Sequence, residues 1–228
     1  MEEKEEKFSI DTENLKNETA ETAKKVKESM KETNIKDETI ATKGFITEMI
    51  KNPLEKIKEV AEDNSAKFFK TALFLLIIWT IAVFIKSTQQ TIYLFGFSRV
   101  FSNILAVLKK ILTPAIGILV YSVIVLLLNT KNKKSLTTII STVTIAQIPL
   151  IVADVVSLLT IISKNMSTIT SPFASLCFAI SIVLSFFGFK YLFGKEESKD
   201  FIKKYVLIQA IYAVCYIVIR LLGIYIYM

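Results

Sequence analysis

The sequence predicts an all-α fold: a polytopic membrane bundle of about five transmembrane helices, preceded by a charged N-terminal tail. Acidic residues are concentrated at the N-terminus, since residues 1–70 hold 17 of the chain's 21. The remainder consists mainly of apolar runs, each near the ~20 residues that a helix needs to cross ~30 Å of hydrocarbon. These runs are continuous, whereas strands of a membrane barrel alternate, and backbone groups in lipid must be paired internally.

Residues 1–44 form the charged tail. Glutamate and lysine are interspersed, and the apolar residues Leu15, Val26 and Met30 are too sparse for a continuous stripe. This composition predicts a disordered segment or a solvated, weakly stable helix. Such a tail is either a soluble spacer or an arm that folds on a protein partner.

Residues 45–65 are predicted to contain a short amphipathic helix. Asn52 is a suitable N-cap, and Pro53 suits the first helical position. Ile57 and Val60 then share an apolar face, opposite lysines and glutamates. A helix of this kind lies at the cytoplasmic membrane surface or packs against the protein's own loops.

Residues 66–228 are predicted to form the transmembrane domain. Its five apolar runs are Phe68–Ile85, Ile111–Leu128, Leu136–Ser163, Phe173–Phe193 and Tyr205–Tyr227. Residues 87–110 are neither a clean loop nor a span. We interpret them as an interfacial helix that leads into the second span, or as a partly re-entrant segment.

Basic residues predict the orientation, because they are more frequent in cytoplasmic loops. With the tail inside, twelve lysines lie near the membrane on the cytoplasmic side, against five basic residues outside. The N-terminus is therefore expected in the cytoplasm and the C-terminus outside. The net charge of +7 comes from loops and helix ends, so no nucleic-acid partner is expected.

The third run is the most polar of the five. Its first half is rich in threonine and serine, and Gln147 and Pro149 follow. Proline lacks the N–H that continues a helix, so we predict a kink there, with hydroxyl groups satisfying the freed carbonyls.

Two charged residues deep inside the spans need a partner or a water path: Asp154 in the third run and Arg220 in the fifth. Counting from the span ends places both in the outer half at similar depth. We predict that they form an ion pair that fixes the register of the two helices. Two alternatives remain: a proton or ion relay through Asp154, or an Arg220 that reaches the outer surface while Asp154 lies in a wet crevice.

No catalytic, cofactor or metal site is predicted. The chain has no histidine, which excludes catalytic triads and the histidine-containing zinc and haem sites. Its six glycines are scattered, and no acidic cluster has metal-binding spacing. We therefore expect a protein without enzymatic activity and without a cofactor.

The layout resembles the Yip1 family of five-helix membrane proteins, especially its bacterial members. Asn52-Pro53-Leu54-Glu55 is similar to the family's "NP" segment, and Ala146-Gln147-Ile148-Pro149-Leu150 is similar to its helix with an "IP" pair. The resemblance covers residues 45–228. The Asp-Leu-Tyr-Gly-Pro motif of eukaryotic relatives is absent, so their binding to trafficking GTPases is not carried over.

The resemblance implies a membrane-organising scaffold that contacts the bilayer and recruits protein partners through its N-terminal tail. The alternative is a small transporter or channel subunit that uses the polar third span and Asp154. The sequence is equally compatible with a monomer and with a homo-oligomer.

Overall fold

The computed structural model describes residues 12–32, 35–63, 65, 67–95, 104–128, 134–194 and 198–221. Every regular element in these ranges is a helix, which confirms the all-α prediction. The elements are α1 (Thr12–Glu32), α2 (Ile35–Lys51), α3 (Pro53–Glu62), α4 (Phe69–Phe95), α6 (Ile104–Leu128), α7 (Leu136–Ala146), α8 (Ile148–Ser157), the 3₁₀ turns η1 (Leu158–Ile161) and η2 (Lys164–Met166), α9 (Ser167–Phe193) and α10 (Ser198–Leu221).

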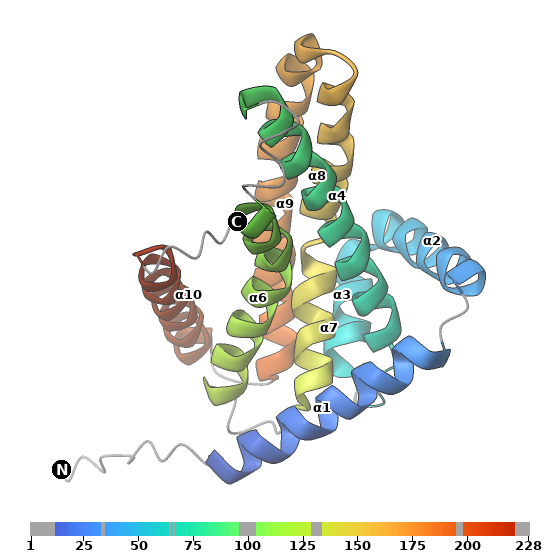
Figure 1. Ribbon diagram of the computed structural model, residues 1–228. Helices are drawn as coiled ribbons and strands as arrows, with labels where there is room; N and C mark the ends of the chain where they lie inside the picture. The colour runs from blue at the N-terminus through green and yellow to red at the C-terminus, as the bar shows by residue number, and fades with distance from the viewer. Residues whose placement is uncertain are drawn as a thin grey trace, which may run out of the picture.

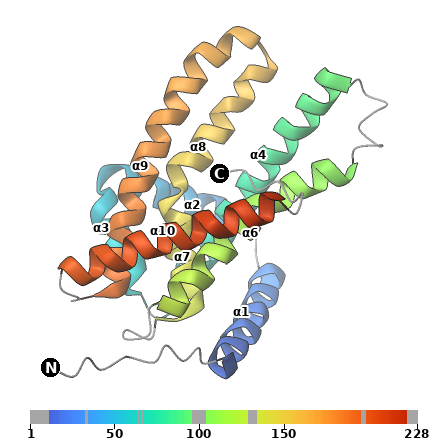
Figure 2. The ribbon, with the colours of Figure 1, turned by 90° about the vertical axis from the view of Figure 1, so that its left-hand side faces the viewer.

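The long helices run side by side between two distinct ends (Figure 1). At one end α1 lies across the bundle, and we name this the α1 end. At the other, α8 and α9 are joined through η1 and η2, and we name this the hairpin end (Figure 2). α10 crosses the bundle obliquely and packs mainly against α6.

Two helical stretches of the described residues are long and apolar enough to cross a membrane, Phe69–Gln90 in α4 and Ser167–Phe193 in α9. A third is present if Leu136–Ala146 and Ile148–Ile161, which meet at 47°, form one bent span. Within α6, Leu112–Leu128 is a shorter apolar helix. The structure thus supports a membrane protein with two or three candidate spans. The predicted count of five is not reached within the ranges described.

α7 lies at the centre of the bundle, enclosed by α3, α4, α6 and α9 (Figure 1). All 11 of its residues are buried. Ser135 caps its first turn, because its hydroxyl accepts a hydrogen bond from Thr138 N at 3.2 Å. Ser141 and Thr142 donate to the carbonyls four residues earlier. Ser141 and Thr142 can be buried here because their hydroxyl groups are satisfied within the helix itself.

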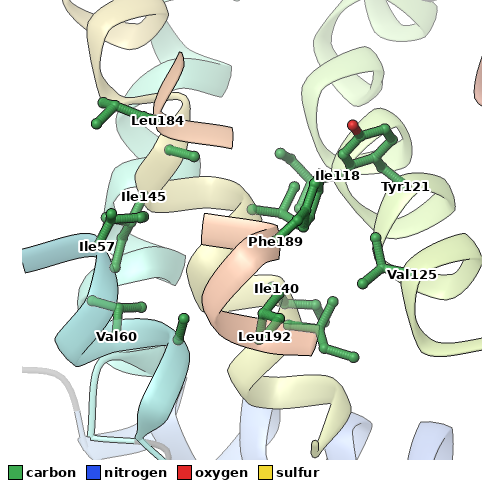
Figure 3. Packing of buried hydrophobic residues seen from close by; sticks show 14 of the residues in the cluster. Ile57, Val60, Ile118, Tyr121, Val125, Ile140, Ile145, Leu184, Phe189 and Leu192 are labelled. Carbon is green, nitrogen blue, oxygen red and sulfur yellow. The ribbon is translucent and has the colours of Figure 1, made fainter. Parts of the chain in front are cut away.

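α3 packs against helices of the bundle rather than against loops. Ile57, Val60 and Ala61 are at most 1% exposed and face α7 and α9 (Figure 3). Gly188 of α9 allows this approach, since a Cβ atom there would lie 3.3 Å from Ile57 Cγ1 and 3.0 Å from Thr142 Cγ2. The apolar face predicted from the sequence is present in α3, and it is covered by α7 and α9. Asn52 and Pro53 begin α3 as predicted, although the Asn52 side chain makes no capping hydrogen bond.

The predicted tail is helical where the structure describes it, and it contacts the bundle. Glu18 Oε2 accepts a hydrogen bond from Leu136 N at 3.1 Å, and Thr22 is buried. Phe45 of α2 packs on Phe68 with ring centroids 5.6 Å apart. Since α2 runs through residue 44, the boundary expected there is not a boundary of the structure. Residues 1–11 and 33–34 lie outside the described ranges.

A carboxylate organises the turn between α3 and α4. Asp63 Oδ1 accepts hydrogen bonds from Ser65 N at 2.9 Å and Ser65 Oγ at 2.6 Å, and Oδ2 accepts from Lys67 N at 2.9 Å. The Asp63 carbonyl accepts from Thr138 Oγ1 of α7 at 2.7 Å. This residue therefore ties three helices together at the α1 end.

Asp63 should make stability depend on pH. Burial opposes ionisation, but the hydrogen bonds from Ser65 and Lys67 outweigh it and lower the pKa of the carboxyl group. A lowered pKa contributes stability above the unfolded value of about 3.9, and that contribution is lost as pH falls through the folded value. We expect Asp63→Asn to be less stable by about 1 kcal/mol at pH 7. Thermal unfolding by circular dichroism should show that the difference in stability between the two proteins becomes smaller below about pH 4. A difference that stays constant with pH would contradict a stabilising role of the ionised Asp63.

Candidate functional site: two adjoining cavities

Two cavities lie beside each other among α4, α6, α8 and α9. The inner cavity has a volume of about 380 Å³ and also reaches α7 and α10. The outer cavity, of about 500 Å³, extends toward the hairpin end. They adjoin, because both are lined by Trp79, Thr113, Pro114, Leu150 and Phe178.

The break between α7 and α8 lies at the inner cavity. Gln147 forms a turn between the two helices, and Pro149 lacks the N–H that would continue the hydrogen-bond ladder. The kink expected at Gln147 and Pro149 is present as a bend of 47°. Gln147 lines the cavity, and its Nε2 donates to Ser185 Oγ of α9 at 3.2 Å.

The polar groups of the inner cavity are uncharged. Gln147, Ser181 and Ser185 come from the α7–α8 break and α9, and Gln209 of α10 donates from Nε2 to the Tyr121 hydroxyl of α6. Ser181 is 2% exposed, and its hydroxyl has no hydrogen-bond partner among the residues that the structure describes. Most of the remaining wall is aliphatic or aromatic.

Aromatic side chains lie next to the inner cavity on the side of the α1 end. Tyr121 packs on Phe189, with ring centroids 5.4 Å apart, and edge-on against Tyr212 at 4.7 Å. Phe189 is 1% exposed and also lies 5.9 Å from Tyr205. In the close view, Phe189 of α9 lies between the α3 contact and α6, which carries Tyr121 (Figure 3). These rings separate the cavity from the tightly packed α1 end.

The outer cavity contains an ion pair. Asp154 Oδ2 accepts a hydrogen bond from Trp79 Nε1 at 2.7 Å, and Oδ1 lies 3.2 Å from Lys86 Nζ. The side chain of Asp154 is 29% exposed and that of Lys86 is 50% exposed. An indole N–H and an ammonium group thus hold the carboxylate between α4 and α8.

Asp154 has two side-chain partners that were not predicted from the sequence. We expected Arg220, but the contacts of Asp154 within the described part of the chain are to Trp79 and Lys86. The side chain of Arg220 lies outside the described residues, so its pairing stays a prediction. Lys86 was interpreted as the end of a span, whereas α4 continues to Phe95. The available signal was the seven-residue spacing of Trp79 and Lys86, which places both on one helical face.

Comparisons with protein-family models, curated proteins and solved structures found no match for this chain. The resemblance to the Yip1 family therefore rests on the short motifs and on the predicted layout of the chain. The described residues also contain no group of three or more acidic or cysteine side chains placed to hold a metal ion.

Proposed function

We propose that this is a multi-pass membrane protein without catalytic activity that moves a small solute or ion through its bundle, as a transporter or channel subunit. The observation that carries the proposal is the interrupted third span, whose halves meet at 47° beside two adjoining cavities. Interrupted membrane helices place backbone and polar groups at binding sites. Asp154, at the wall of the outer cavity, is the kind of intramembrane charge that marks a proton or ion path.

The proposed topology has five spans in a bacterial cytoplasmic membrane, with the N-terminus inside and the C-terminus outside. The distribution of basic residues supports it, as does the clustering of the charged helices α1 and α3 at one end of the bundle. With this orientation the outer cavity lies on the external side and the inner cavity near the middle of the membrane.

Proton flux tests the proposal. Full-length protein is reconstituted into liposomes that contain a pH-sensitive dye, and a potassium diffusion potential is imposed with valinomycin. We expect vesicles with the unaltered protein to take up protons faster than protein-free vesicles. Vesicles with Asp154→Asn should take up protons at the protein-free rate. Asparagine keeps an acceptor for the Trp79 indole, so this variant removes mainly the charge. Asp200→Asn removes an exposed carboxylate from α10 and should leave uptake unchanged.

A scaffold that resembles the Yip1 family is the second candidate function. It is favoured by α1, on which most of the side chains between residues 17 and 27 are exposed. Absence of proton uptake would contradict a proton path through Asp154. If full-length protein then captured partners by crosslinking in intact membranes, and a chain lacking residues 1–33 did not, recruitment by α1 would replace it. This deletion leaves α2, with its buried Phe45, in place.

A further inference from the structure

We propose that the inner cavity binds a neutral amphiphile, a molecule with an uncharged hydrogen-bonding head and an apolar body. The inference deepens the proposed function, because it names the class of solute that the protein takes. Movement of this ligand across the membrane rests on the proposed function, whereas binding of the ligand does not. Binding is measured separately from flux, so each proposal can fail alone.

The charge of the walls argues for an uncharged ligand. Among the residues that the structure describes, none that lines the inner cavity is acidic or basic. A charged head would lose its hydration there without gaining an opposite charge. Asp154 and Lys86 line the outer cavity instead and already form an ion pair with each other.

The polar groups argue for a ligand head that forms hydrogen bonds. Ser181 presents a buried hydroxyl that has no partner among the described residues, and a buried group of this kind gains more from a hydrogen bond than an exposed one does. Gln147 and Gln209 are oriented across the cavity by their bonds to Ser185 and Tyr121. A ligand head at Ser181 therefore meets side chains that are already held in place.

The walls and the entry route argue for an apolar body. Small-molecule sites are mostly apolar cavities of roughly 300–1,000 Å³ with few polar groups, and the inner cavity of about 380 Å³ fits this description. Phe178 and Ile182 of α9 line it and are 50% and 47% exposed. The wall of the cavity on α9 is therefore partly open and apolar, which suits a ligand that arrives from the hydrocarbon.

The test uses three probes that share one apolar body: farnesol, farnesyl phosphate and farnesylamine. Trp79 is the only tryptophan of the chain and lines both cavities, so its fluorescence reports binding directly. With full-length protein in nanodiscs, we expect a saturable emission shift with farnesol. The phosphate and the amine should bind at least about tenfold more weakly.

Variants locate the site on α9. Ser181→Ala should weaken farnesol binding about fivefold, as the loss of one hydrogen bond to an uncharged group does. Ile180→Ala changes the adjacent residue, which is 42% exposed and lines neither cavity, and should bind as the unaltered protein does. Ser181→Leu fills the cavity and should abolish the shift; gel filtration shows whether it folds, and Ser181→Ala remains informative if it does not.

Three results would overturn the inference. They are equal or tighter binding of a charged probe, a shift that does not saturate, and a shift that is the same in Ser181→Ala and Ile180→Ala. Saturable farnesol binding without proton flux would retain the site and reject the proton path through Asp154. Proton flux without farnesol binding would retain the proton path and reject the proposed binding site.

Discussion

Replacing Ile57 with alanine is expected to lower the free energy of unfolding by about 2–5 kcal/mol, the usual range for a buried isoleucine. Ile57 is 0% exposed and lies where α3 crosses α7 and α9. Figure 3 shows it beside Ile145. The loss should be large because Gly188 and Thr142 already approach closely on this side, and the helices cannot collapse onto the space that the side chain leaves.

Leu54→Ala is the matched control, because it removes an aliphatic side chain from the same helix at a position that is 41% exposed. Its effect should stay within about 0.5 kcal/mol. Thermal unfolding of both variants in mild detergent, followed by circular dichroism, gives the comparison. If α3 merely rested on the membrane surface, Ile57→Ala would change stability as little as Leu54→Ala.

Replacing Lys86 with methionine is expected to destabilise the protein by about 1–3 kcal/mol, since it removes the ammonium group from a carboxylate that is mostly shielded from solvent. The loss of stability should be near the lower limit of this range, because Asp154 is 29% exposed and keeps the Trp79 hydrogen bond. Asp154→Asn should cost less, because Lys86 is half exposed and its long side chain can reach water.

The double variant Lys86→Met/Asp154→Asn provides the decisive comparison. It leaves neither charge unpaired, so its melting temperature should exceed that of Lys86→Met alone. The same cycle with Arg220→Met tests the pairing expected from the sequence. If Asp154→Asn rescues Arg220→Met and not Lys86→Met, Arg220 is the partner that matters and the Lys86 contact contributes little.

Features that depend on local chemistry could be predicted from the sequence. The start of α3 at Pro53 and the bend at Gln147 and Pro149 follow from what proline does to a backbone. The all-α class follows from the length of the apolar runs. In each case the cause lies within a few residues of the effect, so a single sequence carries the information.

Features that depend on distant partners could not be predicted in this way. An apolar stripe shows that Ile57 is covered, but the stripe looks the same whether lipid or α9 covers it. The partner of Asp154 was sought by estimating depth from the span ends, and this method failed to indicate Lys86 because α4 is longer than its apolar run. The cavities were not foreseen at all, since their walls come from six separate helices.

The contact between α3 and α9 sets an order of events during synthesis. Ile57 and Gly188 are about 130 residues apart in the chain, so α3 leaves the ribosome long before its binding surface exists. A nascent chain that has not yet produced α9 carries an amphipathic helix with its apolar face unpaired, and such helices adsorb to membrane surfaces. We therefore expect α3 to lie at the membrane surface until α9 has been synthesised, and then to dock on α9.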